Sequence, residues 1–337
     1  MTDRGGVPEP TPPPRDNREA DDRPATDGPD GPVPSRSVPA GSDPPGSVPY
    51  ADDPFVSHRG LLFTVAYEML GSAADAEDVV QESWLRWAGA DREQVREPRA
   101  YLVRIVTRQA LNRMRTVARR REEYIGQWLP EPLLTTPDVA EDVELAESVS
   151  MAMLTVLETL QPVERAVFVL REVFAVPHEE IAAALDKTTA ATRQIARRAR
   201  THVEARRPRT RVSAAEREQV SERFLAAVRG GDLDTLLELL APDVVFVGDG
   251  GGFVKAVLRP VTGAQKVARL LAAGHRRVDI DGRTVPVNGG PGLWIEADGR
   301  FAALGSLEIV DGLITGIYTV NNPHKLTRLS EPTRFER

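Results

Sequence analysis

Arginine side chains that could contact nucleic acid recur along one predicted helix near the middle of the chain. Arg193, Arg197 and Arg200 are spaced by four and three residues, which places them on one face of a helix. Guanidinium groups hydrogen-bond to guanine edges and to phosphates, so this face could enter a DNA major groove. A solvated basic helix that ends a bundle is the alternative, because such spacing is common in proteins that do not bind DNA.

Two short helices and a turn would hold this basic face in position. Residues 177–185 predict the first helix, with Pro177 at a first helical position, where no N–H is needed. Residues 186–189 supply a turn and a threonine cap, and residues 191–203 predict the second helix. The order is typical of a helix-turn-helix. The candidate DNA-contacting residues of the second helix are Thr192, Arg193, Gln194, Arg197, Arg198 and Arg200.

A helix about a hundred residues upstream concentrates acidic side chains on one side. Ser72 and Asp75 predict a capping box that opens it, and its apolar stripe runs to about Ala88. An acidic face suits a protein partner better than nucleic acid. The residues expected on this face are Asp75, Glu77, Asp78, Gln81 and Glu82.

A second basic helix is expected after Pro98. Residues 99–121 contain eight arginines and no acid, so no interspersed acidic residues balance their charge. A solvated helix face is the alternative. The candidate DNA-contacting residues are Arg104, Arg108, Asn112, Arg113, Arg115 and Arg119.

The last third of the chain predicts an α+β unit. Helical periodicity ends near Leu240, and strand-like runs follow at residues 244–247, 278–287, 293–297, 301–309 and 313–320. Asp298-Gly299 and Asp311-Gly312 predict hairpin turns. Acid–base chemistry there would need a carboxylate or histidine held by a second polar group, and no spacing singles one out. The candidates for such chemistry are Asp249, His275, Asp279, Glu296 and Glu308.

Composition restricts the remaining possibilities. The first 50 residues hold 13 of the 27 prolines and predict a disordered acidic extension, which either competes with DNA or only aids solubility. The chain has no cysteine, which excludes disulfides and thiolate metal sites. No apolar run approaches the roughly 20 residues of a membrane span. We expect a cytoplasmic protein with no metal, no cofactor and no membrane contact.

In this order, these motifs resemble those of the extracytoplasmic-function sigma factors, the subunits that direct bacterial RNA polymerase to promoters. Residues 70–87 are similar to the helix of region 2 that binds core polymerase, and residues 98–121 to the helix that reads the −10 element. Residues 157–207 are similar to region 4, with residues 192–200 as the −35 recognition helix. The resemblance implies two partners, the clamp of the polymerase beta-prime subunit and promoter DNA, and no chemical step.

Three further segments, residues 128–132, 249–252 and 322–326, resemble the motifs of the sigma-factor group that carries a C-terminal SnoaL-like domain. The resemblance implies a cone of the SnoaL or NTF2-like fold that regulates the sigma domains in cis, with contacts among the three motifs. Phe253 stands where the group usually has lysine, and His324 where it usually has aspartate. The motif residues expected to make the regulatory contacts are Trp128, Leu129, Pro130, Glu131, Pro132, Asp249, Gly250, Gly251, Gly252, Asn322, Pro323, Lys325 and Leu326.

The expected organisation is two all-α sigma domains followed by the α+β cone. The resemblance requires no anti-sigma protein, and a small-molecule ligand of the cone is left open. A stand-alone DNA-binding regulator with a ligand-sensing cone is the alternative, followed by a cyclase-like or isomerase-like enzyme fused to a DNA-binding module. The expected boundaries are an extension at 1–50, region 2 at 54–125, a linker at 126–146, region 4 at 147–208, the cone at 213–325 and a tail at 326–337.

Overall fold

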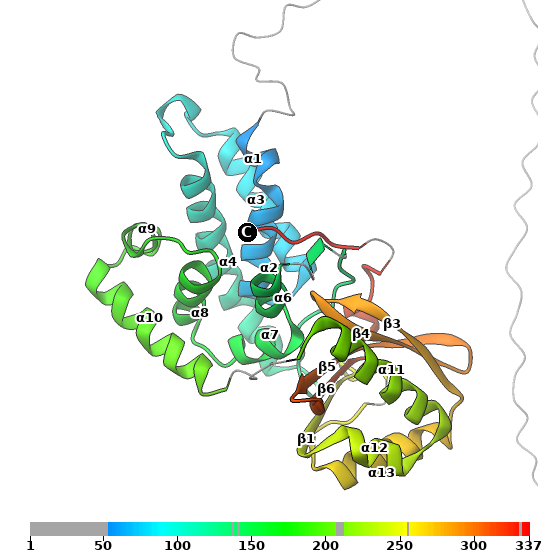
Figure 1. The fold of residues 1–337 in the computed structure, drawn as a ribbon. Coiled ribbons are helices and arrows are strands. Elements are labelled where there is room, and N and C mark those ends of the chain that lie inside the picture. Colours follow the sequence, from blue (N-terminus) through cyan, green and yellow to red (C-terminus); the bar gives the residue numbers. More distant parts are fainter. Residues whose placement is uncertain (1–52, 137, 140–141, 207–211, 255, 330–331) are drawn as a thin grey trace, which may run out of the picture. The chain divides into compact units, whose positions relative to one another are not determined.

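The computed structural model describes residues 53–136, 138–139, 142–206, 212–254, 256–329 and 332–337 (Figure 1). The disorder and the two roles predicted for the first 50 residues lie outside this part of the chain. The side chains of Arg119 and His275 are also outside the description.

The first helical domain contains α1 (Pro54–Ser57), α2 (Arg59–Leu70), α3 (Ala73–Ala88), the short 3-10 helix η2 (Arg92–Gln94) and α4 (Pro98–Glu122). Every residue of α2 from Leu61 to Leu70 is buried, so this helix forms the centre of the domain. Gly71 ends α2 with a φ of 66°, a conformation that favours glycine. Ser72 then caps α3 by accepting the N–H of Asp75, as the sequence predicts.

The second helical domain contains α6 (Val143–Ser148), α7 (Met151–Leu157), α8 (Pro162–Phe168), η3 (Val169–Val173), α9 (His178–Ala184) and α10 (Thr189–Glu204). Thr188 caps α10 by accepting the N–H of Ala191, which confirms the predicted threonine cap. Pro177 is the N-cap of α9 rather than its first helical residue, because its ψ of 143° is extended. The pair α9 and α10 forms the predicted helix-turn-helix.

The C-terminal domain begins with α11 (Ala214–Gly230) and α12 (Leu233–Leu239) and contains a six-stranded sheet. Strands β3 to β6 form an antiparallel meander, and β1 pairs with β6 in parallel. Helices α11, α12 and α13 cover one side of this sheet (Figure 1). The strands, with the helix between β2 and β3, are β1 (Leu240–Asp249), β2 (Val261–Thr262), α13 (Ala264–His275), β3 (Ile280–Val287), β4 (Gly290–Ala297), β5 (Arg300–Val310) and β6 (Leu313–Val320).

Both predicted hairpin turns are present. Asp298 and Asp311 have φ values of 50° and 49°, and a glycine with positive φ follows each of them. Asn288 and Gly289 form a third turn of this kind between β3 and β4. That turn, α13 and β2 are not among the elements predicted from the sequence.

The last residues of the chain pack on the first helical domain. Thr333 pairs with Thr135 of the linker, and the N–H of Glu336 donates to the Thr64 hydroxyl of α2. Phe335 is buried, with its ring 5.3 Å from that of Tyr67. The tail is therefore part of the core of a domain that lies more than two hundred residues earlier.

Candidate nucleic-acid interface

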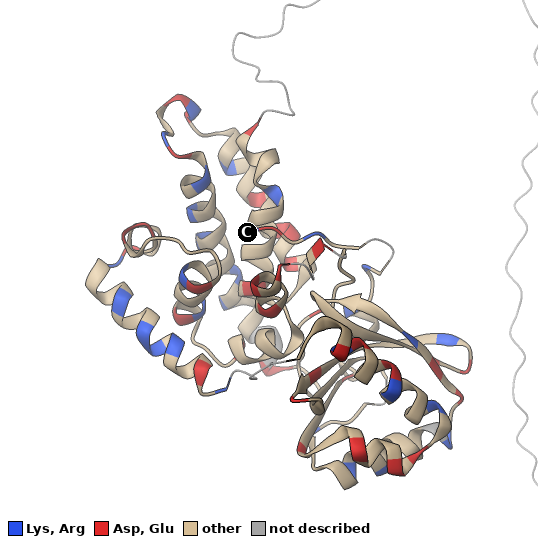
Figure 2. Cartoon of the chain, in the orientation of Figure 1, with Lys and Arg blue, Asp and Glu red and all other residues tan. Residues whose placement is uncertain are grey.

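The basic face of α10 is exposed to solvent. Arg197 and Arg198 are exposed, and so are Arg193, Gln194 and Arg200. Figure 2 shows the arginines of this helix following one another along its length. Thr192 is the exception among the predicted contacts, because it is fully buried and its hydroxyl donates to the carbonyl of Thr188. Its side chain therefore belongs to the packed side of α10 and not to the exposed basic face.

Three of these arginines contact acidic residues of the preceding elements. Arg193 lies 3.0 Å from Glu179 of α9, and Arg200 lies 2.6 Å from Glu172 of η3. Arg198 lies 3.9 Å from Glu164 of α8. Exposed ion pairs contribute little free energy and are screened by salt. These ion pairs therefore hold the arginines only weakly.

The residues of α4 predicted to contact DNA divide into an exposed set and a set that packs against α3. Asn112 and Arg115 are exposed, and Arg104 is half-buried with its guanidinium 5.0 Å from the Tyr101 ring. Arg113 instead turns back to α3, where it lies 2.7 Å from Asp75 and 2.5 Å from Asp78.

This pairing corrects the predicted placement of two residues. Asp75 is buried and is not part of the exposed acidic face. Arg113 supports the packing of α3 against α4, because its guanidinium is engaged by both carboxylates.

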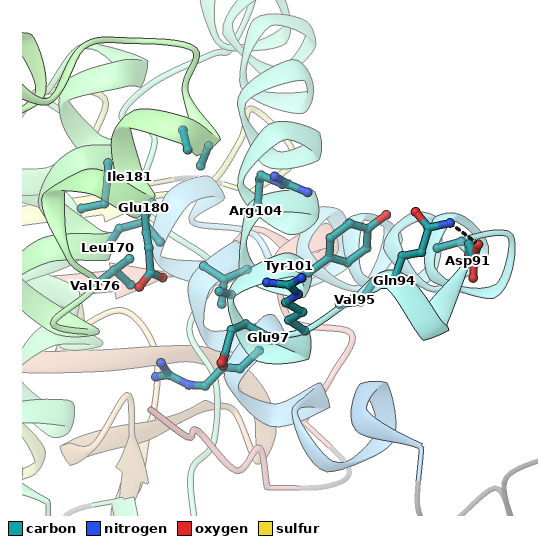
Figure 3. Close-up of a pocket in the computed structure, with 17 residues that line it drawn as sticks. Asp91, Gln94, Val95, Glu97, Tyr101, Arg104, Leu170, Val176, Glu180 and Ile181 are labelled. Carbon is teal, nitrogen blue, oxygen red and sulfur yellow. Dashed lines mark hydrogen bonds between the residues drawn. The ribbon is translucent and has the colours of Figure 1, made fainter.

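Arg108 of α4 contacts the helix-turn-helix. Its Nε donates to the carbonyl of Ala184 at 2.8 Å, and its second nitrogen lies 2.8 Å from the Asp186 carboxylate in the turn. A pocket of about 510 Å³ lies beside this contact, with Tyr101 and Arg104 on one side and Glu180 on the other (Figure 3). Two surfaces expected to bind separate promoter elements thus contact each other.

The acidic face of α3 is partly covered. Asp78, Gln81 and Glu82 are exposed. Glu77 is half-buried, with Arg59 at 2.7 Å and Arg328 of the tail at 3.7 Å. The tail therefore reaches the edge of the surface predicted to bind core polymerase.

Asp249, at the end of β1, connects the C-terminal domain to the linker. Its side chain is fully buried and accepts hydrogen bonds from the Leu129 N–H at 2.9 Å and from the Tyr124 hydroxyl. The ammonium group of Lys325 lies 2.7 Å from the same carboxylate. A buried carboxylate requires such partners, since an uncompensated buried charge costs several kcal/mol.

Lys325 also contacts the linker directly. Its ammonium group donates to the Leu129 carbonyl and lies 3.3 Å from the centroid of the Trp128 ring. A cation over an aromatic face is attracted by the ring quadrupole, and desolvation strengthens this attraction. Lys325, Asp249, Trp128, Leu129 and Tyr124 form one cluster, hereafter the clamp cluster.

The glycines after Asp249 allow the loop to approach the linker closely. Gly251 has a φ of 60°, and a Cβ there would lie 2.3 Å from Asn322 Nδ2 and 2.9 Å from the Tyr124 hydroxyl. Asn322 in turn donates to that hydroxyl at 2.7 Å. Residues of all three motifs therefore contact one another. Gly250, Gly252, Pro323 and Leu326 lie in the same segments.

The linker contacts the first helical domain through Glu131. Its buried carboxylate accepts the N–H of Ala73 at 2.8 Å at the start of α3, and its carbonyl accepts the Tyr67 hydroxyl at 2.6 Å. Burial raises the pKa of the Glu131 carboxyl group above its usual value, although the hydrogen bonds from the N–H groups of Ala73 and Ala74 and from the Ser72 hydroxyl act in the opposite direction. Pro130 and Pro132 beside it are buried as well.

The two positions that depart from the group's usual motifs contact each other. The rings of Phe253 and His324 lie 4.4 Å apart at an interplanar angle of 64°. An aromatic contact thus occupies the place where the resemblance leads one to expect lysine and aspartate.

Asn288 is a contact residue that the sequence analysis missed. Its side-chain oxygen accepts the Leu133 N–H at 2.9 Å, and its nitrogen donates to the Tyr67 hydroxyl at 2.7 Å and the Val149 carbonyl at 2.9 Å. One turn of the sheet thus joins the linker to both helical domains. The Asn-Gly dipeptide, a strong hairpin signal, could have drawn attention to it.

The candidates for acid–base chemistry are scattered. Asp249 belongs to the clamp cluster, Asp279 is exposed, and Glu296 accepts the Trp294 indole N–H. Burial raises the pKa of Glu308, which accepts the Tyr318 hydroxyl at 3.1 Å. The structure does not bring these four residues together, and within the described chain no group of acidic residues and histidines has the arrangement of a metal site.

Comparison with known protein families identifies the two helical domains. Residues 55–121 match Sigma-70 region 2, and residues 150–203 match Sigma-70 region 4. These regions define a sigma factor of RNA polymerase, the class that the basic helices and their order predict. None of the helices described in the structure is long and apolar enough to cross a membrane.

Individual related proteins identify the type of sigma factor more closely. The ECF RNA polymerase sigma factor SigJ of Mycobacterium tuberculosis is 38% identical over 301 residues, which cover 83% of this chain and 96% of SigJ. The probable ECF sigma factor SigI of the same organism is 32% identical over 283 residues, with 83% and 94% covered. The crystal structure of SigJ aligns with a TM-score of 0.68 at 35% identity, over 82% of this chain and 98% of that chain.

The chain therefore belongs to the extracytoplasmic-function RNA polymerase sigma factors. Its partners as a sigma factor are core RNA polymerase and promoter DNA. The predicted order of two helical sigma domains followed by an α+β domain is confirmed.

Proposed function

We propose that the C-terminal domain and tail of this sigma factor restrain its two sigma domains in a form that does not bind a promoter. Release of this restraint allows promoter-specific initiation. The observation that carries the proposal is the clamp cluster, in which Asp249 and Lys325 hold both polar groups of Leu129 in the linker. Because all parts belong to one chain, modest contacts suffice at a high effective concentration.

The contact of Arg108 with the helix-turn-helix supports the restrained state. The proposed reader of the −10 element is α4, through Arg104, Arg108, Asn112 and Arg115. The proposed reader of the −35 element is α10, through Arg193, Gln194, Arg197, Arg198 and Arg200. Arg108 cannot contact both DNA and the carbonyl of Ala184, so its side chain has to leave α9 and the turn before it can contact DNA.

The proposed surface for core polymerase is the exposed part of α3. Asp78, Gln81 and Glu82 present polar and acidic groups there, and Glu77 lies at the edge that Arg328 of the tail reaches. Polymerase binding at this edge would compete with the tail. Restraint and activation are thereby coupled at one surface.

We assign the C-terminal domain a regulatory and not a catalytic role, since its one fully buried carboxylate serves the clamp cluster. The restraint is intramolecular, so the proposal needs no separate anti-sigma protein. The site of action is the cytoplasm, where core polymerase and promoter DNA are found. A stand-alone DNA-binding regulator would have no use for the acidic face of α3.

The proposal is tested by measuring the separation of the sigma domains in the free protein. Because the chain has no cysteine, Ala88→Cys and Thr201→Cys introduce two unique labelling sites, on α3 and α10. Lys325→Met in this background should lower energy transfer between the dyes and raise promoter affinity, because the linker loses its cation. The matched control is Arg300→Met, at an exposed arginine of β5. Unchanged energy transfer and unchanged DNA affinity in a folded Lys325→Met variant would refute the proposal.

A further inference from the structure

The C-terminal domain has its own concentration of basic residues, in a segment that the clamp cluster does not use. Residues 250–278 contain six lysines and arginines and no acidic residue. The domain as a whole, residues 213–325, is slightly acidic, with 14 acidic and 12 basic residues. Half of its basic residues therefore lie in one segment from which acidic residues are absent.

Helix α13 displays four of these cations on one face. The helical turn continues past the end of α13, because the N–H groups of Arg276 and Arg277 donate to the carbonyls of Ala272 and Gly274. At 3.6 residues per turn the four side chains fall within an arc of about 100°. The opposite face of α13 is buried, through Val267, Ala268 and Ala272. The four exposed residues, hereafter the α13 basic face, are Lys266, Arg269, Arg276 and Arg277.

The α13 basic face has no acidic partner in the described part of the chain. Other exposed arginines of the domain do have one: Arg229 lies 2.7 Å from Asp281, and Arg223 lies 3.9 Å from Glu238. Like charges three or four residues apart destabilise a helix. A bound anion would relieve this repulsion, which the described residues leave unbalanced.

The helix dipole explains only part of this arrangement. Arg276 and Arg277 lie at the C-terminal end of α13, where the dipole favours cations. Lys266 lies in the first turn, where the dipole disfavours a cation. The stability of the helix thus accounts for one end of the α13 basic face and not for the other. An extended polyanion would stabilise both ends.

The length and chemistry of this face fit the phosphate backbone of duplex DNA. From Lys266 to Arg277 the helix rises about 16 Å, which is the axial length of about five nucleotides of one strand. Residues 264–277 contain no phenylalanine, tyrosine or tryptophan on which unpaired bases could stack. A membrane surface would need exposed apolar side chains beside the cations, and the apolar face of α13 is buried.

We propose that the α13 basic face is an additional DNA-binding surface of this sigma factor, which contacts the phosphates of duplex DNA whatever their sequence. Phosphate contacts raise affinity and fix position without reading bases. The C-terminal domain thereby adds to the promoter affinity that the two sigma domains supply. The four side chains are exposed while the clamp cluster is formed, so this proposal does not depend on the restraint.

The salt dependence of DNA binding tests the proposal, with the full-length protein, a labelled duplex of arbitrary sequence and fluorescence anisotropy as the readout. The variant combines Lys266→Gln, Arg269→Gln, Arg276→Gln and Arg277→Gln. Each lost phosphate contact lowers the slope of log affinity against log salt by about 0.9, so we expect a slope smaller by about 2 to 4. The advantage of the wild type should then shrink by about tenfold or more between about 50 and 200 mM salt.

The matched control removes the same charge from exposed positions of the same domain outside α13. It combines Arg223→Gln, Arg229→Gln, Arg283→Gln and Arg300→Gln, and it should keep the wild-type slope. An equal loss of slope in the two variants would overturn the proposal, because net charge alone would then explain the effect. A wild-type slope in the α13 variant would also overturn it and would point to an acidic protein as the partner of this face.

A second measurement detects the contact directly and keeps the cations in place. Because the chain has no cysteine, Ala273→Cys provides a unique attachment site for iron–EDTA, between the cations of the α13 basic face. We expect the attached iron to cleave bound DNA. Ala226→Cys, at an exposed position of α11, is the control and should give little cleavage. Equal cleavage from the two positions, or none from Ala273→Cys, would overturn the proposal.

Discussion

Glu68 illustrates how a single buried carboxyl group can set the pH response of the sigma domains. It lies on α2, fully buried, with Ser148 and Arg165 of the second helical domain beside it. Burial raises its pKa to about 8, although the Ser148 hydrogen bond and the Arg165 charge act in the opposite direction. The Ser148 hydroxyl lies 2.8 Å from Glu68 and 2.9 Å from the Leu145 carbonyl. One hydroxyl proton cannot serve both acceptors fully, which is consistent with a protonated carboxyl group at neutral pH.

We expect the free energy of unfolding to fall as the pH rises from about 5 to about 8. In this range the unfolded chain has released the Glu68 proton and the folded chain retains it, so the folded state binds more protons. Glu68→Gln removes this dependence, and its stability relative to the wild type should rise by about 4 kcal/mol across the range. Urea unfolding at pH 5 and pH 8 measures the difference. Glu93→Gln, at an exposed glutamate, is the control, and an equal difference at both pH values for Glu68→Gln would contradict the account.

At the scale of secondary structure, most elements follow from local chemistry, whereas the tail does not. Ser72, Thr188 and the Asp-Gly turns are local signals, and each lies where the sequence predicts a cap or a turn. The burial of Asp75 and Thr192 was not predictable, because it depends on which face of α3 or α10 meets another helix. The docking of Phe335 on α2 is a contact across more than two hundred residues. Helical or strand periodicity carries no information about such a contact.

The tail should detach when its aromatic anchor is removed. Phe335 packs on Phe63 and Tyr67 with centroid separations of 6.2 and 5.3 Å, and truncation of a buried phenylalanine typically costs about 3 to 5 kcal/mol. Phe335→Ala should therefore release the backbone around Arg334 and Arg328 from the helical domain, and trypsin should cleave the tail several times faster. Phe253→Ala is the matched control, because that ring is 61% exposed. Equal cleavage rates in the two variants would show that the tail is held by other contacts.

At the scale of the whole molecule, the sequence motifs predict which segments meet but not how the sigma domains are held. The resemblance indicates that the linker, the glycine loop and the Asn322 segment contact one another, and the clamp cluster agrees with this. The contact of Arg108 with Ala184 and the role of Asn288 required the three-dimensional structure. Both contacts arise from packing between domains. The local sequence patterns within each domain do not specify such packing.

Runoff transcription with core RNA polymerase on genomic promoter fragments tests the central claim most directly. Full-length protein is compared with Lys325→Met and with Arg300→Met as the control. We expect the same start sites for all three proteins. Lys325→Met should give at least about fivefold more transcript than the wild type, because a coupling free energy of the usual size no longer opposes promoter binding. Equal or lower transcript from a folded Lys325→Met variant would contradict it and would mean that the clamp cluster does not restrain initiation.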